Sequence, residues 1–337
     1  MIRTACENPD TEKDTIMKKI SILVSCYNEE ENVVPLTHAI VECMNTELPQ
    51  YDYELIFIDN HSTDNTKPLL RQLCAENPKV KAIFNAANFG QLRSPVYGLK
   101  QTTGDCTIKM VCDFQDPIEM IPKFVREWEN GHKVVIGIKT KSKENPIMYA
   151  IRGAYYYIFN KLTDVEHIRQ FTGFGLYDRS FMNILRAVND PVPYFRGLVA
   201  EYAKQRKEIP YTQPKREKGK TKNNFYTLYD IGITGLTTYS KALMRLAILV
   251  GGACSCLSFL VAIGYFIYKL LNWNSFSAGI APLVIGMFLL GGIQLIFIGI
   301  MGEYILCINE RTKNRPLVVE ECRLNFEPEE EKEEAAV

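Results

Sequence analysis

The chain has 337 residues, with 39 Lys and Arg against 39 Asp and Glu, so its formal net charge is zero. This net charge includes a basic segment, residues 204–222, and an acidic end, residues 327–334, so only the local charge is informative. We expect no nucleic-acid partner. The ten cysteines lie scattered without CxxC pairs. This excludes a zinc site and a disulfide framework, and it fits a reducing cytoplasmic compartment.

Residues 1–17 are polar and mixed in charge, without the apolar segment of a signal peptide, and we expect a disordered leader there. Strand and helix patterns alternate from residue 19 onward. Apolar runs predict strands at 19–25, 54–58, 80–84 and 106–111, and helical spacing predicts helices at 30–44, 64–74 and 91–102. Such alternation predicts an α/β fold with a Rossmann-like, mostly parallel sheet covered by helices.

Polar side chains follow all four predicted strands. They are Tyr27, Asn28 and Glu29 after the first strand, Asp59 and Asn60 after the second, Asn88 and Gly90 after the third, and Asp113, Gln115 and Asp116 after the fourth. Asn, Asp and Gly also occur at strand ends simply as turn formers. Four consecutive strand ends of this kind instead favour a ligand site, because ligands of open α/β sheets bind beyond the carboxyl ends of the strands. The groups suit a polar ligand with ribose hydroxyls and phosphates.

Two apolar runs without ionisable residues, 246–268 and 281–302, are each long enough to cross a hydrocarbon core of roughly 30 Å as a helix. Basic residues flank the pair on its outer sides, at Lys241 and Arg245 before it and at Arg311, Lys313 and Arg315 after it. The link at 269–279 carries one Lys. The positive-inside rule therefore predicts an integral membrane protein with two spans and both termini in the cytoplasm.

Three motifs carry a resemblance to a known family. Ser25-Cys-Tyr-Asn-Glu29, Asp59-Asn-His-Ser-Thr-Asp64 and Asp113-Phe-Gln-Asp-Pro117 resemble, in order and approximate spacing, the nucleotide-sugar motifs of family 2 glycosyltransferases of the GT-A fold. With a basic loop, two apolar runs, Gly302-Glu-Tyr304 and Arg315-Pro316 behind them, the combination is similar to the polyprenyl-phosphate glycosyltransferases. That group includes dolichyl-phosphate mannose synthase and bacterial undecaprenyl-phosphate glucosyltransferases. The likeness covers residues 18–320.

The resemblance implies a domain order. We expect the leader at 1–17, a cytoplasmic GT-A domain at 18–240 that contains the basic loop 204–222 and a juxtamembrane helix, a two-helix transmembrane region at 241–308, and a cytoplasmic tail at 309–337 that is acidic at its end. It also implies a bacterial plasma membrane as the location and a homo-tetramer as a possible assembly.

The resemblance further implies how the nucleotide sugar binds. Ser25, Tyr27, Glu29 and Asp59 would contact the base and ribose, and Asn88 and Gly90 would lie beside the diphosphate. Carboxylates accept hydrogen bonds from base N–H groups and ribose hydroxyls, and a glycine lets the backbone approach a phosphate. Asp64 is instead expected to act at the start of a helix.

The family's metal motif, Asp-x-Asp-x-Gln, is incomplete because Val111 replaces its first aspartate. Asp113 and Gln115 remain as hard oxygen ligands for Mg²⁺ or Mn²⁺ that bridges a sugar diphosphate, at a weakened site. Asp116 is expected either as an indirect support of the metal ligands or as a cap of the following helix.

The family position of a catalytic carboxylate reads Thr172-Gly173-Phe174, so no base transfers to it. A phosphate acceptor needs none, because a phosphomonoester is already anionic near neutral pH. A solvated charge run or a lipid-headgroup contact is the simple interpretation of the basic loop. The sharper hypothesis is that Arg216, Lys220 and Lys222 bind the lipid phosphate or the leaving diphosphate. Arg152, Arg179 and Arg196 are further candidates for that role.

The predicted function is inverting transfer of a hexose from a nucleotide sugar, UDP-linked rather than GDP-linked, to a membrane-bound polyprenyl phosphate, for cell-envelope glycan or lipid modification. A first alternative is a membrane-anchored glycosyltransferase that acts on a saccharide or glycolipid hydroxyl, with Asp116 or Asp164 as the base. A second alternative is an inactive nucleotide-sugar-binding assembly subunit.

Overall fold

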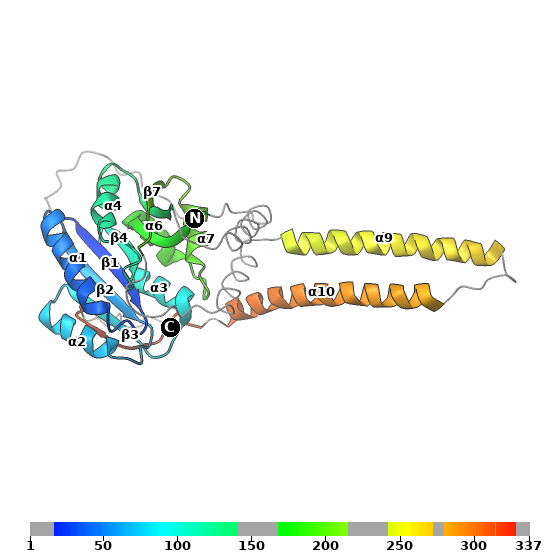
Figure 1. The fold of residues 1–337 in the computed structure, drawn as a ribbon, viewed down its shortest axis with the longest axis horizontal. Coiled ribbons are helices and arrows are strands. Elements are labelled where there is room, and N and C mark those ends of the chain that lie inside the picture. Colours follow the sequence, from blue (N-terminus) through cyan, green and yellow to red (C-terminus); the bar gives the residue numbers. More distant parts are fainter. Residues whose placement is uncertain (1–16, 141–167, 215–241, 272–279, 314, 328–337) are drawn as a thin grey trace, which may run out of the picture.

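Two long helices extend from one side of an α/β domain and lie side by side (Figure 1). The computed structural model describes residues 17–140, 168–214, 242–271, 280–313 and 315–327. The expectations for the leader, for Arg152 and Asp164, for the loop from residue 215 onward and for most of the acidic end lie outside these residues.

The first part of the domain alternates strands and helices as the sequence predicts. Its elements are β1 (Lys19–Cys26), α1 (Val33–Glu47), β2 (Asp52–Asp59), α2 (Thr66–Glu76), β3 (Val80–Asn85), α3 (Gly90–Lys100) and β4 (Cys106–Val111). The strands are apolar and rich in β-branched residues, which favour an extended backbone. Because Ile22 and Leu23 are both fully buried, β1 is covered on both faces, as is typical of a central parallel strand.

The second part of the domain adds α4 (Met120–Glu129), β5 (Val134–Lys139), β6 (Phe171–Asp178), α6 (Arg179–Ala187), α7 (Phe195–Tyr202) and β7 (Lys207–Tyr211). β7 lies inside the segment that the sequence analysis treats as a basic loop, and it pairs in parallel with β5. Part of that segment is therefore a strand of the sheet.

The described strands form one sheet in the order β7-β5-β6-β4-β1-β2-β3-β8, in which β8 comprises Glu320–Leu324. The central strands β4, β1, β2 and β3 are parallel, whereas β6 is antiparallel to both of its neighbours. The sheet is mixed, with a parallel centre and antiparallel pairings toward both edges. Because these strands are parallel, the carboxyl ends of β1, β2 and β4 lie together at one end of the sheet, as the predicted ligand site requires.

Helices cover both faces of the sheet. Leu36 of α1, Leu70 of α2 and Phe124 of α4 belong to one apolar core. Helices α3, α6 and α7 pack on the opposite face and bury a second core. Figure 1 shows α3 and α7 on the side from which the long helices extend, and α1 and α2 on the far side. The second face is thus the one nearer to the long helices.

The segment after the long helices returns to the domain as a strand that the sequence analysis does not predict. β8 (Glu320–Leu324) pairs antiparallel with β3 at the edge of the sheet. Beyond it, the Asn325 amide donates to the carbonyls of Cys74 at 2.7 Å and Val80 at 2.8 Å. Part of the expected tail therefore belongs to the folded domain.

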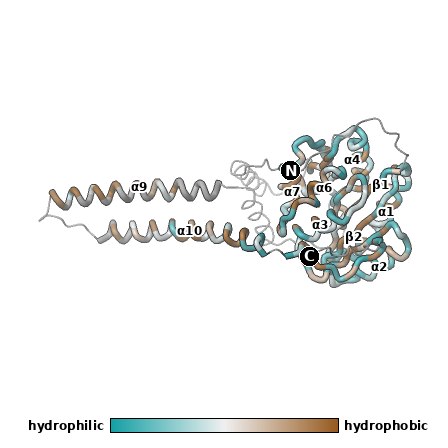
Figure 2. The backbone as a smooth tube through the Cα atoms, turned by 180° about the vertical axis from the view of Figure 1, so that it is seen from behind, coloured by the Kyte–Doolittle hydropathy of each residue, from teal (hydrophilic) through white to brown (hydrophobic). Residues whose placement is uncertain are grey.

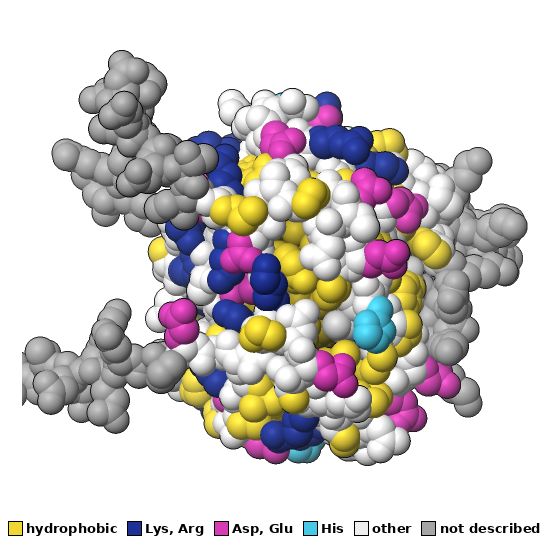
Figure 3. Space-filling view, turned by 90° about the vertical axis from the view of Figure 1, so that its left-hand side faces the viewer, with side chains coloured by type: hydrophobic (Ala, Val, Ile, Leu, Met, Phe, Trp, Pro, Cys, Tyr) yellow, Lys and Arg dark blue, Asp and Glu magenta, His cyan; other side chains and the backbone are white. Residues whose placement is uncertain are grey.

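The two long helices are α9 (Ala242–Leu271) and α10 (Ile280–Thr312). Within the described residues, one segment, Leu290–Thr312 of α10, is long and apolar enough to cross a membrane. Figure 2 shows the apolar colouring of the helices, and Figure 3 shows acidic and basic side chains interspersed on the opposite end of the molecule. A second span in α9 stays a prediction.

Candidate active site

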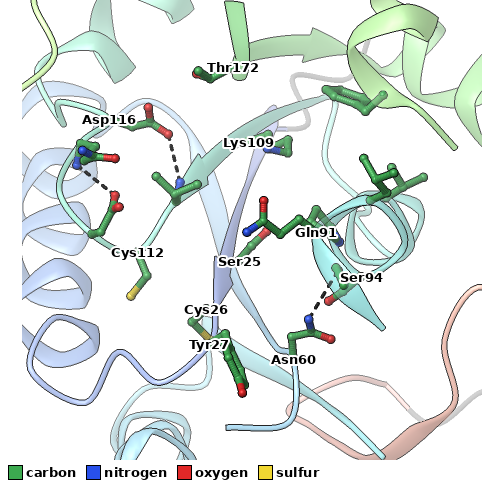
Figure 4. Close-up of a pocket in the computed structure, with 18 of the residues that line it drawn as sticks. Ser25, Cys26, Tyr27, Asn60, Gln91, Ser94, Lys109, Cys112, Asp116 and Thr172 are labelled. Carbon is green, nitrogen blue, oxygen red and sulfur yellow. Dashed lines mark hydrogen bonds between the residues drawn. The ribbon is translucent and has the colours of Figure 1, made fainter. Parts of the chain in front are cut away.

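A pocket of about 400 Å³ opens where the carboxyl ends of β1 and β4 meet the start of α3 and α7. Figure 4 shows Asp116 and Cys112 on one side of this pocket, Gln91 and Ser94 of α3 on the other, and Ser25 between them. Of the predicted site residues, it brings together Ser25, Tyr27, Glu29, Gly90, Asp113, Gln115 and Asp116. The predicted edge of the sheet is therefore the location of the pocket.

The loop after β1 presents its side chains to the pocket because hydrogen bonds to the loop after β2 and to the start of α2 fix its backbone. Asn28 has a positive φ of 53°, and its N–H donates to the Ser62 hydroxyl at 2.8 Å. The Glu29 N–H donates to Thr66 Oγ1 at 2.8 Å, and the Glu29 carboxylate accepts from Asn32 at 2.6 Å. Ser25 Oγ is buried without a hydrogen-bond partner among the described residues. This hydroxyl can serve a ligand.

Asp59 and Asn88 lie outside the pocket lining and instead shape the loops around it. The Asp59 carboxylate is buried and accepts hydrogen bonds from the N–H and hydroxyl of Ser62, while burial raises the pKa of Asp59. The Asn88 oxygen accepts from Asn60 at 2.8 Å and from the Gly90 N–H at 2.9 Å. Asn60, which does line the pocket, thereby ties the loop before α3 to the end of β2.

Asp64 acts at the start of a helix, as predicted. Its carboxylate accepts from the N–H of Thr66, the first residue of α2, at 3.0 Å and from the Thr66 hydroxyl at 2.6 Å. Among the described residues, it is not part of the pocket lining.

Asp113 and Gln115 both line the pocket, and Phe114 between them packs against the core of α1 and α4. A positive φ of 57° at Phe114 turns the chain here, and the Gln115 N–H donates to Asp113 Oδ1 at 3.2 Å. Mg²⁺ is usually bound through one or two carboxylates plus the phosphates of a substrate. The donor set of one carboxylate and one amide fits that mode, with substrate oxygens and water completing the shell.

Asp116 is buried at the side of the pocket, where it connects the end of β4 to β7. Its carboxylate accepts from the Val111 N–H at 3.0 Å and from the Tyr211 hydroxyl at 3.4 Å. Burial raises the pKa of Asp116 to about 6, against the opposing effect of Lys109. It does not cap the following helix, because α4 begins only at Met120.

Three cationic side chains also line the pocket: Lys109 of β4, Lys139 at the end of β5 and Arg196 of α7. The sequence analysis named Arg196 and missed the two lysines. A signal for Lys109 existed, since it interrupts an otherwise apolar strand. Arg179 lies at the opposite end of the strands from the pocket, where its guanidinium donates to the carbonyls of Thr103 and Gly104, just before β4. Arg216, Lys220 and Lys222 lie outside the described residues.

Comparison with known proteins assigns the class of this domain. The profile of the family described as Glycosyl transferase family 2 matches residues 21–185. The glycosyltransferase YkoT of Bacillus subtilis (strain 168), described as uncharacterized, is 31% identical over 304 residues and covers 88% of this chain and 89% of its own. The chain therefore belongs to glycosyl transferase family 2, and its mixed α/β domain agrees with the GT-A-like fold that the motifs imply.

Two further proteins that are similar to this chain carry more specific names. The bactoprenol glucosyl transferase of Shigella phage SfX is 29% identical over 299 residues, which are 88% of this chain and 97% of that protein. Glucosyl-3-phosphoglycerate synthase from Mycobacterium tuberculosis, solved with phosphoglyceric acid, aligns with a TM-score of 0.48 and 14% identity over 66% of this chain and 79% of its own.

Proposed function

We propose that this glycosyltransferase transfers glucose from a nucleotide sugar, UDP-linked rather than GDP-linked, to a polyprenyl phosphate at the cytoplasmic face of a bacterial plasma membrane. The observation that carries the proposal is the extent of the match to relatives named bactoprenol glucosyl transferase. The match to the relative of Shigella phage SfX leaves 12% of this chain unaligned. That unaligned part is shorter than α9, of 30 residues, and α10, of 33 residues, taken together. The likeness therefore includes at least part of the long helices outside the α/β domain.

The pocket supplies groups that suit the donor. Ser25, Tyr27 and Glu29 offer hydroxyl and carboxylate groups to the base and ribose. Asp113 and Gln115 would hold Mg²⁺ or Mn²⁺, which supplies positive charge to the sugar diphosphate. Asp59 and Asn88 support this part of the pocket indirectly, through the loops that they fix.

The proposed reaction is a single displacement with inversion. An oxygen of the acceptor phosphate forms a bond to the anomeric carbon of the sugar, and the bond from that carbon to the donor diphosphate breaks. The nucleoside diphosphate leaves with the electron pair. The attacking phosphate oxygen carries no proton to remove, so the reaction needs no carboxylate at Thr172.

The long helices support a membrane location. On α10, Leu295, Ile296 and Ile298 are 71%, 64% and 62% exposed, far more apolar surface than a helix in water usually presents. We propose that both α9 and α10 span the bilayer and that both termini face the cytoplasm, because the predicted outer flanks are basic.

The test is transfer of labelled sugar from a panel of UDP- and GDP-sugars to undecaprenyl phosphate in detergent, with Mg²⁺ or Mn²⁺. The expected product is acid-labile and lipid-extractable, and it disappears in Asp113→Ala. The matched control is Asp52→Asn, which removes a carboxylate at the amino end of β2, away from the pocket. Donor binding without turnover would instead favour an inactive assembly subunit and overturn the proposal.

A hydroxyl acceptor is the second candidate. It is favoured by Asp116, which lines the pocket and has a pKa raised to about 6 by burial, a value suited to a general base. The same assay separates the two, since a glycoside formed on a sugar hydroxyl is stable to the mild acid that cleaves a sugar phosphate. Loss of transfer in Asp116→Asn with a saccharide acceptor would support this alternative.

A further inference from the structure

Lys109 is a charged residue in the middle of a buried strand. β4 is an apolar strand whose other side chains are buried or half-buried, and Lys109 itself is 8% exposed. The ammonium faces the second core, where it lies 5.9 Å from the centre of the Phe195 ring of α7. Its remaining open side is the pocket (Figure 4).

Within the described part of the chain, the Lys109 ammonium makes no hydrogen bond and no ion pair; it lies over the Phe195 ring, and the Asp116 carboxylate acts on it electrostatically. Lys81 of β3 differs because its ammonium lies 2.8 Å from the buried Glu54 carboxylate. Burying a charge that makes no hydrogen bond or ion pair lowers stability, and desolvation lowers the pKa of Lys109 to about 8, against the opposing effect of Asp116. A ligand phosphate next to the ammonium would supply the direct hydrogen bond and counter-charge that Asp116 does not.

The neighbouring strand makes room for this ammonium. Gly173 of β6 has a positive φ of 98°, and a Cβ at this position would lie 3.1 Å from Lys109 Nζ. A side chain here would be strained by the backbone and would also crowd the ammonium. The glycine between Thr172 and Phe174 therefore keeps the space that Lys109 occupies.

Lys109 has a second cation beside it in the pocket lining. In Figure 4, Asp116, which follows β4, lies on one side of the pocket, and Lys109 lies toward α3. Arg196 of α7 lies close enough to Lys109 to lower its pKa further, and both line the pocket. A phosphate bound between these two cations would have both of them as counter-charges.

The side of the pocket where these two cations lie is the side nearer to the long helices. Helices α3 and α7 face them (Figure 1), and two ion pairs tie the end of α10 to this region. Arg93 of α3 pairs with Glu310 at 3.4 Å, and Asp190 before α7 pairs with Arg311 at 3.3 Å. A lipid headgroup that reaches the pocket from the membrane approaches through this side.

We propose that the Lys109 ammonium binds the phosphate of the polyprenyl phosphate acceptor, with Arg196 as its neighbour, and orients this phosphate toward the sugar. The proposal rests on the proposed function and assigns one of its substrates to a residue of β4. Hydrogen bonds from a charged donor to a phosphate are strong, so Lys109 contributes mainly to acceptor binding.

The test uses the full-length enzyme in detergent with Lys109→Met and Lys109→Arg. Undecaprenyl phosphate is varied at saturating donor, and the donor is then varied at saturating lipid. In Lys109→Met we expect the KM for the lipid to rise about tenfold or more, with the KM for the donor within about twofold of wild type. Lys109→Arg, which keeps the charge, is expected to recover part of the lipid affinity.

The control is Lys79→Met, which removes a lysine that pairs with Asp52 on the surface far from the pocket. Met matches the stem of Lys and removes a buried charge that makes no hydrogen bond or ion pair, so thermal unfolding of Lys109→Met is expected at or above the wild-type temperature. An active Lys109→Met with an unchanged KM for the lipid would overturn the inference alone, as would a rise confined to the KM for the donor. Absence of lipid product with the wild type would overturn the proposed function and this inference together.

Discussion

Glu54 is a buried carboxylate at the amino end of β2, whereas the pocket lies at the carboxyl ends of the strands. Its oxygens accept from the Ser21 hydroxyl at 2.5 Å and the Thr103 N–H at 2.7 Å, and they pair with Lys81 at 2.8 Å and Lys19 at 3.2 Å. Burial alone raises the pKa of Glu54, but Lys81 and these hydrogen bonds outweigh it and lower the pKa from 4.5 to about 2. The charged form is therefore the one that the fold stabilises.

The size of this stabilisation follows from the shift in pKa. Each tenfold change in acidity corresponds to about 1.4 kcal/mol, so a pKa lowered from 4.5 to about 2 contributes roughly 3 kcal/mol to the free energy of unfolding at neutral pH. Glu54→Gln keeps the shape and removes the charge, and it also leaves the Lys81 ammonium without its partner. We expect the free energy of unfolding to fall by about 3 kcal/mol.

The assay is urea unfolding of the full-length protein in detergent, followed by the fluorescence of Trp128. The chain has two tryptophans, so a Trp273→Phe background makes Trp128 of α4 the single reporter. The control is Asp52→Asn on the same strand. Its carboxylate is 43% exposed in an ion pair with Lys79, and we expect a loss below about 1 kcal/mol.

The pH dependence gives the sharper test. A carboxyl whose pKa is lower in the folded state stabilises the protein above its unfolded pKa, and this contribution disappears as the pH falls through the folded pKa. The difference between wild type and Glu54→Gln is therefore expected to shrink between about pH 4.5 and pH 2. A difference that stays constant over this interval, or a changed KM for the donor, would refute the reasoning.

Three further predictions concern other parts of the chain. Gly173→Ala is expected to lower the free energy of unfolding by about 1–3 kcal/mol, because φ at this position is 98°, and to raise the KM for the lipid more than that for the donor; equal changes in both would contradict this. Asn325→Ala leaves the carbonyls of Cys74 and Val80 without their donor, so hydrogen exchange of β8 is expected to accelerate while that of β1 is unchanged. Arg93→Ala breaks an ion pair with the 42% exposed Glu310, and we expect a change in stability below about 1 kcal/mol in urea unfolding; a larger loss would show that this contact anchors α10.

The central strands were predictable because their signal is local. Runs of apolar, β-branched residues in β1 and β2 specify extended structure without reference to the rest of the chain. The position of the pocket then followed from a general property of parallel sheets. β8 carries no such signal, because three of its five residues, Glu320, Glu321 and Arg323, are charged, and the segment becomes a strand through pairing with β3, far away in the sequence.

The individual site residues were harder to predict because burial is not a local property. Asp59 ends a strand beside the pocket, but its carboxylate is buried by the turn to Ser62, three residues later. An Asp followed by Ser at this spacing is a local sign of such a turn. Lys109 could be noticed as a charge in an apolar strand, but its access to the pocket depends on where α3 and α7 lie.

The position of β8 in the chain has a consequence for how the protein is made. Translation releases β1 to β7 first, then α9 and α10, and only afterwards the residues of β8. Until then the outer edge of β3 is unpaired, and open strand edges are prone to pair with other chains. The last strand of the sheet can thus be added only after the ribosome has delivered both long helices, so the domain is completed after the helices have been synthesised.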